Sequence, residues 1–441
     1  MKRSGASIVA GLTVAALALT ACGTTDPIAT GSPTGGPSDV PSATTPAEPV
    51  NLTFQSLSDQ PAAIEVTKQI VDSWNKDNPN IQVEIVPAGW DGIYDKLITQ
   101  FNGGAAPDII HYEAASIVPF ARDGYLADLT EHMSADHKAD IPEGILKTVT
   151  VDDQIVGYPT ELQAYMVFAN TKLLADAGVE IPTGDTMTWD QLRDMAKKAT
   201  ANGVTGLGWG LASPTAAMMA MSPGFGGQWF EGTGTDATIT VGDGELALPK
   251  LVHDMAYTDK SLLPVTLTLS GGKTLPYFYD GQIAMTIQGS FQAANVANDA
   301  PDGMEWTVLP PLAGPAGADQ AANPQTLSVN VDSEHIAESV QFIEYFTSTA
   351  NLAAINKADA LIPATTSAQE ALAAEMSGEI GWDNILKSGQ HMTSAPYLFV
   401  DTYAQWKDTV ATPAFQKFQA NEIDAAGLAD ELKSGWDQVN R

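Results

Sequence analysis

Polar and aromatic side chains follow three segments that are predicted to be β-strands. Asp59 lies in the loop 56–60 after the first, Tyr112 and Glu113 come directly after the second, and Phe291 follows the third. Ligands of open parallel sheets bind beyond the carboxyl ends of the strands, so we expect these segments to meet at one site. Carboxylates accept hydrogen bonds and aromatic rings stack on apolar faces, which is the chemistry of ligand binding.

The sequence contains no motif for covalent or metal-dependent catalysis. There is no G-x-S-x-G nucleophile turn, no Walker A phosphate loop and no HExxH zinc helix. The single cysteine, Cys22, excludes an intramolecular disulfide and a zinc site built on paired thiolates. We therefore expect no catalytic residue, no metal and no cofactor, and the protein is predicted to bind rather than to catalyse.

The charge of the chain restricts its partners. Among 441 residues, 53 are acidic and 21 are basic, which gives a formal net charge of -32 at pH 7. This charge repels the phosphates of nucleic acids, and no cluster of lysine or arginine reverses it locally, so nucleic-acid binding is excluded. Apolar residues make up 44 % of the chain, which allows a sizeable core, and the length corresponds to two or three domains.

The N-terminal segment predicts where the protein resides. Lys2 and Arg3 precede an apolar run that has the length of a signal peptide rather than of a membrane span. The run ends in Leu-Thr-Ala-Cys-Gly, which resembles the bacterial lipobox. We expect a signal peptide at 1–21, lipid attachment at Cys22 and a flexible tether at 22–49, rich in Thr, Pro, Gly and Ser. The lipid would hold the protein on the extracellular face of the bacterial cell membrane. The alternative is a plain secretory signal.

Hydrophobic periodicity predicts a doubly wound α/β fold. Alternating apolar residues predict strands at 50–54 and 81–85, and a helix between them begins near Pro61. Two strands joined by a helix normally lie parallel with a right-handed crossover. The later predicted elements are a helix at 93–101, a strand at 107–110, a helix capped by Thr188 and Gln191, strands at 283–287 and 327–331, a helix capped by Ser333, and a last helix at 428–439.

Several stretches resemble the family 1 extracellular solute-binding proteins of bacterial ABC importers, a group that contains maltodextrin- and oligosaccharide-binding lipoproteins. The resemblance runs from about Val50 to the C-terminus and rests on the order and spacing of the stretches. They include Gly-Gly-Ala-Ala-Pro-Asp-Ile-Ile at 103–110, Gly-Tyr-Leu-Ala-Asp-Leu at 124–129, Gly-Tyr-Pro at 157–159 and Tyr-Asp-Gly at 279–281. The family usually has tyrosine before the asparagine that is Asn170 here, whereas this chain has Phe168 and Ala169.

The resemblance implies a two-lobed α/β fold of the periplasmic-binding-protein type (type II), with the ligand cleft between the lobes. Lobes of this kind close on the ligand by a hinge motion. Carried onto this chain, the N-terminal lobe comprises 50–160 and 325–361, and the C-terminal lobe comprises 161–324 and 362–441.

Three crossovers between the lobes are expected near 160–163, 321–325 and 361–365. A proline lies at each of them, and proline would stiffen a hinge because it fixes φ. The three prolines are Pro159, Pro324 and Pro363.

The resemblance also supplies candidate ligand-binding residues. The family's sugar-stacking aromatics match Tyr112 and Phe291, and its polar residues at the first crossover match Glu161 and Gln163. Family members often carry tryptophan where this chain has Phe291, which can stack on a sugar but offers no N–H donor.

The charge of the cleft indicates the class of ligand. Asp59, Glu113, Glu161 and Gln163 with few nearby cations suit a neutral oligosaccharide, whereas anionic ligands would need arginine or lysine. Polyamines stay an alternative, because carboxylates and aromatic rings also hold ammonium groups.

The tryptophans divide between core and cleft. Trp74 and Trp436 lie on apolar helical stripes and are predicted to be core residues. Tryptophans in glycine-rich or polar surroundings are candidates for the cleft, and Trp209 and Trp406 stay unassigned. This adds three tryptophans and one histidine to the predicted ligand-binding set: Trp90, Trp229, Trp382 and His391.

The predicted function is that of a lipid-anchored, monomeric receptor that captures an oligosaccharide and delivers it to the permease subunits of an ABC transporter. Two alternatives stay open. A surface-anchored glycoside hydrolase would use a carboxylate pair such as Glu113 and Glu161. A surface lectin would bind sugar without closing.

Overall fold

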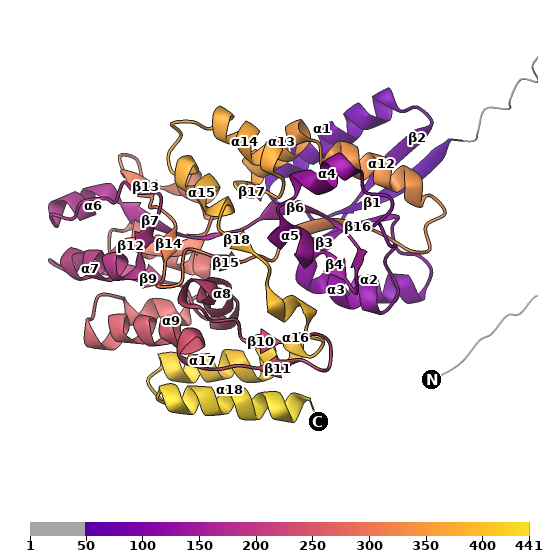
Figure 1. The fold of residues 1–441 in the computed structure, drawn as a ribbon. Coiled ribbons are helices and arrows are strands. Elements are labelled where there is room, and N and C mark those ends of the chain that lie inside the picture. Colours follow the sequence, from indigo (N-terminus) through magenta and orange to yellow (C-terminus); the bar gives the residue numbers. More distant parts are fainter. Residues whose placement is uncertain (1–48, 441) are drawn as a thin grey trace, which may run out of the picture. The chain divides into compact units, whose positions relative to one another are not determined.

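The computed structural model describes residues 49–440, which are organised around two sheets (Figure 1). The larger sheet has six strands, in the spatial order β17 (Ile362–Pro363), β6 (Tyr158–Leu162), β16 (Gln325–Val329), β3 (Ile109–Glu113), β1 (Val50–Ser56) and β2 (Ile81–Pro87). The smaller sheet has four, in the order β13 (Trp306–Val308), β7 (Tyr165–Asn170), β12 (Ile283–Gly289) and β9 (Thr205–Trp209). Cys22 and the predicted signal peptide lie outside the described residues.

Short strand pairs supplement the two sheets. They are β4 (Thr150–Val151) with β5 (Gln154–Ile155), β8 (Met187–Thr188) with β14 (Leu312–Ala313), β10 (Phe230–Glu231) with β11 (Thr238–Ile239), and β15 (Gln320–Ala321) with β18 (Met392–Thr393).

Helices surround the sheets. Those before β12 are α1 (Pro61–Asp77), α2 (Ile93–Asn102), α3 (Ala114–Arg122), α4 (Ala135–Asp140), α5 (Glu143–Thr148), α6 (Thr171–Asp176), α7 (Trp189–Ala199), α8 (Pro214–Met221), α9 (Asp243–His253) and α10 (Leu275–Tyr279). Those after it are α11 (Gln292–Asp299), α12 (Ile336–Phe346), α13 (Thr349–Asp359), α14 (Thr366–Glu375), α15 (Trp382–Gly389), α16 (Tyr403–Trp406), α17 (Thr412–Gln419) and α18 (Ala425–Val439).

The first strand–helix–strand unit has the predicted form. β1 and β2 pair in parallel, from Val50 opposite Ile81 to Ser56 opposite Pro87, and α1 connects them. Pro61 is the first residue of α1, where its missing N–H costs no helical hydrogen bond. The parallel pairing and the connecting helix are therefore confirmed.

The two predicted helix caps have different outcomes. Thr188 Oγ1 accepts a hydrogen bond from the backbone N–H of Gln191, whose side chain accepts one from the N–H of Thr188, so the capping box is confirmed. The N-cap of α12 is His335, so the Ser333 prediction is wrong. The Ser333 hydroxyl donates to Asp108 at 2.6 Å instead, and this longer-range partner fixes its position.

The chain passes between the two sheets at short connections. Only two residues separate β6 in the larger sheet from β7 in the smaller one. The chain returns with β16, which lies between β6 and β3 and runs antiparallel to both. β17 pairs with β6 and lies just past the predicted lobe boundary at 361. The lobe boundaries themselves stay a prediction.

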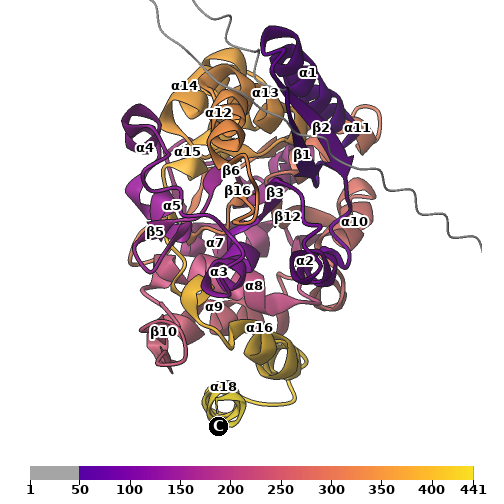
Figure 2. The ribbon, with the colours of Figure 1, turned by 90° about the vertical axis from the view of Figure 1, so that its right-hand side faces the viewer.

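Helices pack on both faces of the larger sheet, because successive strand residues point to opposite faces. On β3, Ile109 joins the cluster of Phe54 and Phe342, whose ring centroids lie 5.6 Å apart. The next residue, Ile110, joins the cluster of Phe120 instead. α1 and α12 thus cover one face and α2 and α3 the other, on either side of the strands in Figure 2.

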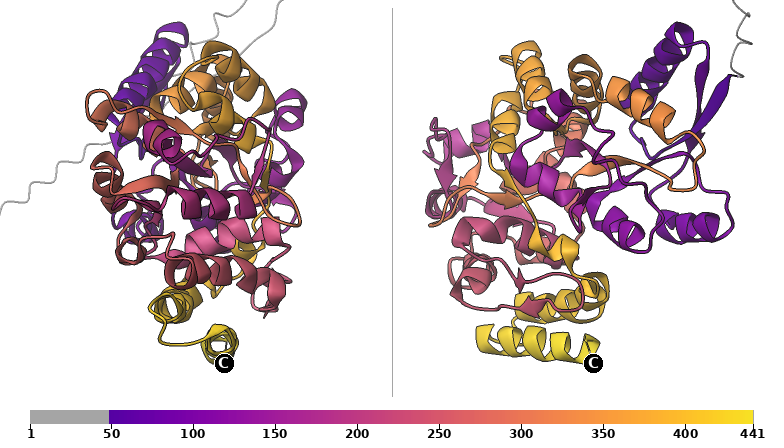
Figure 3. Two further views of the ribbon diagram at one scale, coloured as in Figure 1. Left: turned by 90° about the vertical axis from the view of Figure 1, so that its left-hand side faces the viewer. Right: turned by 45° about the vertical axis from the view of Figure 1, so that its right-hand side comes forward.

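A separate core lies around the smaller sheet and the C-terminal helices. Trp209 and Trp406 are buried in it, and the indole N–H of Trp406 donates to the Leu432 carbonyl at 3.1 Å. α17 and α18 close this core and lie side by side, as the yellow helices of Figure 3 show. Between residues 49 and 440, no helix combines the length and apolar character that a membrane span requires.

Candidate ligand-binding site

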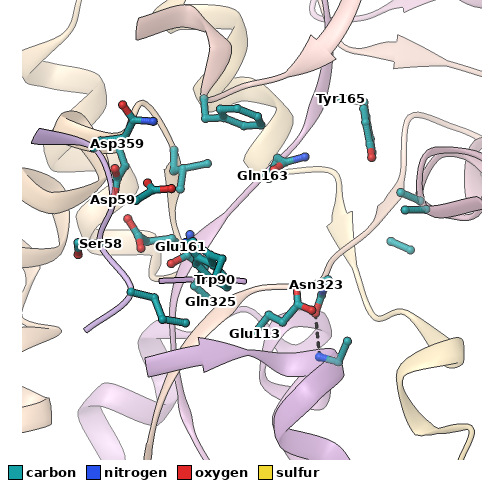
Figure 4. A pocket seen from close by; sticks show the side chains of 18 of the residues that line it. Ser58, Asp59, Trp90, Glu113, Glu161, Gln163, Tyr165, Asn323, Gln325 and Asp359 are labelled. Carbon is teal, nitrogen blue, oxygen red and sulfur yellow. Dashed lines mark hydrogen bonds between the residues drawn. The ribbon is translucent and has the colours of Figure 1, made fainter. Parts of the chain in front are cut away.

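A cavity of about 460 Å³ is lined by residues of both sheets and of the segments between them (Figure 4). The larger sheet contributes the segments after β1 and β2, the ends of β3 and β6, and the start of β16. β7, α8, the segment after β12 and the region of α16 line the rest. The volume lies within the range of about 300–1,000 Å³ that is typical of small-molecule sites.

His111 orients one wall of the cavity from within the sheet. Its ring is buried, and burial lowers its pKa to about 4, so the imidazole is neutral near pH 7. Nδ1 accepts a hydrogen bond from the backbone N–H of Leu57 at 3.1 Å, so the ring proton is on Nε2, which donates to Gln325 Oε1 at 2.6 Å. Gln325 lines the cavity and therefore offers its NH₂ group as the free hydrogen-bond donor.

Glu113, at the end of β3, is held from two sides. Asn323 Nδ2 donates to Oε2 at 2.9 Å, and the Ser116 hydroxyl donates to Oε1 at 3.4 Å. Asn323 Oδ1 accepts from the backbone N–H of Ala115 at 2.9 Å, which fixes the orientation of the amide (Figure 4). Burial raises the pKa of Glu113, against the opposing effects of Asn323 and of the positive charge of Lys407.

Three further carboxyl groups, Asp59, Glu161 and Asp359, form what we call the acidic cluster. Glu161 lies on β6, Asp359 is the last residue of α13, and Asp59 lies in the loop after β1. Burial raises the pKa of Glu161 well above its ordinary value, and the other two carboxylates raise it further. Burial also raises the pKa of Asp359 to about 6. The acidic cluster therefore binds a proton more readily than exposed carboxyl groups do.

Tyr165 and Phe291 line the opposite wall. The Gln320 side chain holds both backbone groups of Tyr165, accepting from its N–H at 2.9 Å and donating to its carbonyl at 3.1 Å. β12 ends at Gly289, where a Cβ atom would lie 2.6 Å from the Phe291 ring and 2.9 Å from the Gln163 amide. Glycine at this position therefore lets both side chains occupy the cavity wall.

Six of the predicted ligand-binding residues line this cavity. They are Asp59, Trp90, Glu113, Glu161, Gln163 and Phe291. They come from segments far apart in the sequence, and the fold brings them to one place. Their contact with a ligand stays a prediction.

Two of the other predicted residues lie in hydrophobic cores. Tyr112 precedes Glu113 on β3 and points to the opposite face, where its ring lies 6.3 Å from that of Phe120. Trp229 is fully buried, and its indole N–H donates to the Ser222 hydroxyl at 2.7 Å. Their predicted place in the cleft is corrected, because the sequence did not show which face of each segment is buried.

Trp382 and His391 also lie outside the cavity lining. Trp382 is the first residue of α15 and packs in the core of the larger sheet. His391 contributes its backbone carbonyl, which accepts from the N–H of Gln320 at 2.9 Å next to the β15–β18 pair. Polar surroundings in the sequence therefore did not indicate cleft residues at these positions.

Sequence reasoning missed several residues of the cavity wall. Asp359 is an acidic residue at the C-terminal end of a helix, which is unfavourable, but Asp77 ends α1 in the same way and is exposed, so this signal alone did not indicate a site residue. The other missed residues are Tyr165, Asn323, Gln325, Tyr397, Tyr403 and Lys407. Among residues 49–440, no group of three or more His, Cys, Asp or Glu side chains is arranged to hold a metal ion.

Comparison with known proteins identifies the family. The sequence model described as bacterial extracellular solute-binding protein matches residues 57–353. The chain belongs to this family. An uncharacterized lipoprotein in the oleD 5′ region of Streptomyces antibioticus is 35 % identical to this solute-binding protein over 391 residues, which cover 88 % of this chain and 86 % of the relative. The resemblance found in the sequence is thereby confirmed, and the family is one of binding proteins rather than enzymes.

Solved structures establish the fold type. The sugar-binding protein MalE of Xanthomonas citri superimposes with a TM-score of 0.77 at 17 % identity, over 89 % of this chain and 97 % of that protein. The cyclic alpha-maltosyl-1,6-maltose binding protein of Arthrobacter globiformis gives 0.76 at 16 % identity, over 89 % and 99 %. The predicted two-lobed fold of the solute-binding protein is confirmed by these matches.

Proposed function

We propose that this solute-binding protein is a lipid-anchored receptor that captures a carbohydrate and delivers it to the permease subunits of an ABC transporter. The observation that carries the proposal is the composition of the cavity wall. Trp90, Tyr165 and Phe291 supply aromatic rings, and Glu113 and Gln325 supply a hydrogen-bond acceptor and a donor in fixed orientations. Sugar rings have apolar C–H faces and a periphery of hydroxyl groups, which these two kinds of side chain match.

The structural neighbours support a carbohydrate ligand. The Xanthomonas protein is known as a sugar-binding protein, and the Arthrobacter protein as a cyclic alpha-maltosyl-1,6-maltose binding protein. In this proposal the two lobes close around the ligand by a hinge at the β6–β7 connection and at the return to β16, and the closed form is presented to the permease.

The membrane anchor is the second part of the proposal. Acylation of Cys22 would place the protein on the extracellular face of the cell membrane as a monomer. The name lipoprotein given to the Streptomyces antibioticus relative supports this part. Mass spectrometry of membrane-extracted protein, compared with a Cys22→Ser variant, should find acyl chains on the former alone, and an unacylated membrane-extracted protein would contradict it.

Calorimetry tests carbohydrate capture. A panel of neutral and aminated mono- to tetrasaccharides is titrated into the soluble protein, and at least one sugar is expected to bind with a Kd of about 1 µM or lower, equivalent to about 8 kcal/mol. Failure of every sugar to bind would refute the proposal.

Two further measurements separate receptor function from the alternatives. Small-angle scattering should show compaction on adding the best ligand, whereas a lectin would bind without it. Incubation with the bound oligosaccharide should release no shorter product. Release that Glu161→Gln abolishes would establish a hydrolase instead.

A further inference from the structure

No positively charged residue among those described acts on Glu161 or Asp359 in the acidic cluster. Among the described residues that line the cavity, Lys407 carries the only positive charge, and its field acts on Glu113. The strand neighbours of Glu161 are Gln325 on β16 and Pro363 on β17, which are uncharged. The charged groups that act on Glu161 are thus the other two carboxylates of the cluster.

One oxygen of the cluster is buried without a partner. The Glu161 side chain lines the cavity, the residue is 4 % exposed, and its Oε1 atom makes no hydrogen bond within the described residues (Figure 4). A buried carboxyl oxygen without a donor is unfavourable, because it has lost the hydrogen bonds that it would make with water. A ligand that donates a hydrogen bond to this atom would replace one of these hydrogen bonds.

The local electrostatic field favours a positive donor. Asp359 is the last residue of the eleven-residue helix α13, and the end of a helix carries a partial negative charge. This partial charge adds to that of the carboxylates. A neutral hydroxyl would satisfy the Glu161 oxygen but would leave the negative field uncompensated, whereas an ammonium group would do both.

We infer that the cavity recognises a basic nitrogen, so that the captured carbohydrate is an amino sugar or another amine-bearing saccharide. The inference rests on the proposed function and replaces the neutral ligand expected from the sequence. The ammonium group donates to Glu161 Oε1 and lies against the acidic cluster, and aromatic rings of the same wall, such as Trp90, can stabilise a cation.

Binding of an ammonium group changes the protonation of the cluster. Burial raises the pKa values of Glu161 and Asp359, that of Asp359 to about 6, so the unliganded cluster is partly protonated near pH 6, and an arriving cation favours loss of that proton to solvent, because an ion pair favours the carboxylate. Each bound ligand therefore releases up to one proton, and affinity rises with pH up to the point where the ligand amine itself loses its charge. A neutral sugar does not favour release of the proton and shows neither effect.

The test is calorimetry with saccharides that differ only in the amine. One series shares a single disaccharide skeleton: cellobiose, chitobiose with free amines and N,N′-diacetylchitobiose. Glucose and glucosamine make the same comparison for a monosaccharide. Maltose and trehalose, each with its amino derivative, extend it to other linkages. We expect the amine to tighten binding at least tenfold within the skeleton that fits. Titration near pH 6.5 in two buffers of different ionisation enthalpy should show proton release.

Variants locate the effect. Glu161→Gln should remove the preference for the amine and the proton release. Glu113→Gln is the matched control, since it removes a cavity carboxylate outside the acidic cluster and should weaken the amine and its neutral counterpart by similar factors. Loss of the amine preference in Glu113→Gln but not in Glu161→Gln would overturn the inference.

The outcomes for the two proposals are distinct. Neutral sugars that bind as tightly as their amines overturn the inference and leave carbohydrate capture standing. A linear polyamine is titrated in the same way, and if it binds while no saccharide does, carbohydrate capture is overturned and, with it, the amino-sugar inference. Binding of no member of the panel overturns both.

Discussion

Replacement of Asp359 by asparagine is expected to stabilise the unliganded protein near pH 7. The residue is 8 % exposed, and burial raises its pKa from an ordinary 3.8 to about 6. The folded state therefore holds the ionised carboxylate less favourably than the unfolded chain does. Asp359→Asn removes the charge but keeps the size of the side chain and one oxygen that can accept a hydrogen bond.

The magnitude follows from the shift in pKa. A difference of about 2 units corresponds to about 3 kcal/mol, at about 1.4 kcal/mol per unit. This penalty is complete above about pH 7, is about half as large near pH 5, and vanishes below about pH 3, where the carboxyl group is protonated in both states. Asp359 therefore makes the wild type more stable as the pH falls through this range, and the variant lacks that contribution.

Urea unfolding at several pH values measures the effect. The free energy of unfolding of Asp359→Asn should exceed that of the wild type by about 3 kcal/mol at pH 7.5 and by about 1.5 kcal/mol at pH 5. His111 has the opposite effect on the pH dependence. Its pKa is lowered to about 4 in the folded state, so the free energy of unfolding decreases as the pH falls from 6.5 towards 4. His111 is common to both proteins and cancels in the difference between them, which then reports on Asp359 together with its effect on Glu161.

Asp77 provides a matched control. It is the last residue of α1, as Asp359 is of α13, but it is exposed. Asp77→Asn should change the free energy of unfolding by less than about 0.5 kcal/mol at each pH. A gain in Asp359→Asn that does not vary with pH, or an equal gain in Asp77→Asn, would refute burial of the carboxylate as the cause.

Three further predictions follow from the geometry. Gly289→Ala should weaken the best sugar ligand at least tenfold in calorimetry, because the new Cβ would displace Phe291 or Gln163. Tyr112→Ala should lower the free energy of unfolding by about 3–5 kcal/mol and weaken ligand binding much less than Phe291→Ala does, because its ring packs in a core and reaches the cavity only through Trp90. Asp153→Gly should raise the free energy of unfolding by about 0.5–1 kcal/mol, because φ is +68° in the two-residue turn between β4 and β5.

Each of these predictions has a control. Gly89→Ala should leave affinity unchanged, since a Cβ at Gly89 has no heavy atom within 4 Å. Phe291→Ala should show the reverse of Tyr112→Ala, with weaker binding and little change in melting temperature. Asp152→Gly should also stabilise, because its φ is +49°. The argument for Gly289 would be contradicted if Gly289→Ala bound the ligand as tightly as the wild type. The argument for Tyr112 would be contradicted by loss of binding in Tyr112→Ala, and that for Asp153 by destabilisation in Asp153→Gly.

The sequence predicted the positions of helices and strands correctly where residues close together in the chain determine them. The alternation in β1 and β2, the proline at the start of α1 and the capping box of α7 are all set within a few positions of the chain. Ser333 shows the limit of such signals. Its hydroxyl accepts a hydrogen bond from the nearby backbone N–H of His335 and also donates to Asp108, 225 residues away, and the helix begins only at Ile336.

Side-chain direction in the site depends on contacts that the sequence does not show. Tyr112 and Glu113 are neighbours in a predicted strand, yet one packs in a core and the other lines the cavity. Gln325 takes its orientation from His111, and Asp359 reaches the site because a helix ends there. Only the assembled sheet determines which of these side chains meet.

The central place of β16 constrains the order of assembly. Gln325 follows its partner His111 by 214 residues, and β16 separates β3 from β6 in the sheet. Until β16 has been synthesised, β3 and β6 each present an unpaired edge, and neither the sheet nor the cavity wall is complete. A chain elongating from its N-terminus can therefore pair β1, β2 and β3 early, but the edges of β3 and β6 stay open to edge-to-edge association until β16 has been made, which takes most of synthesis.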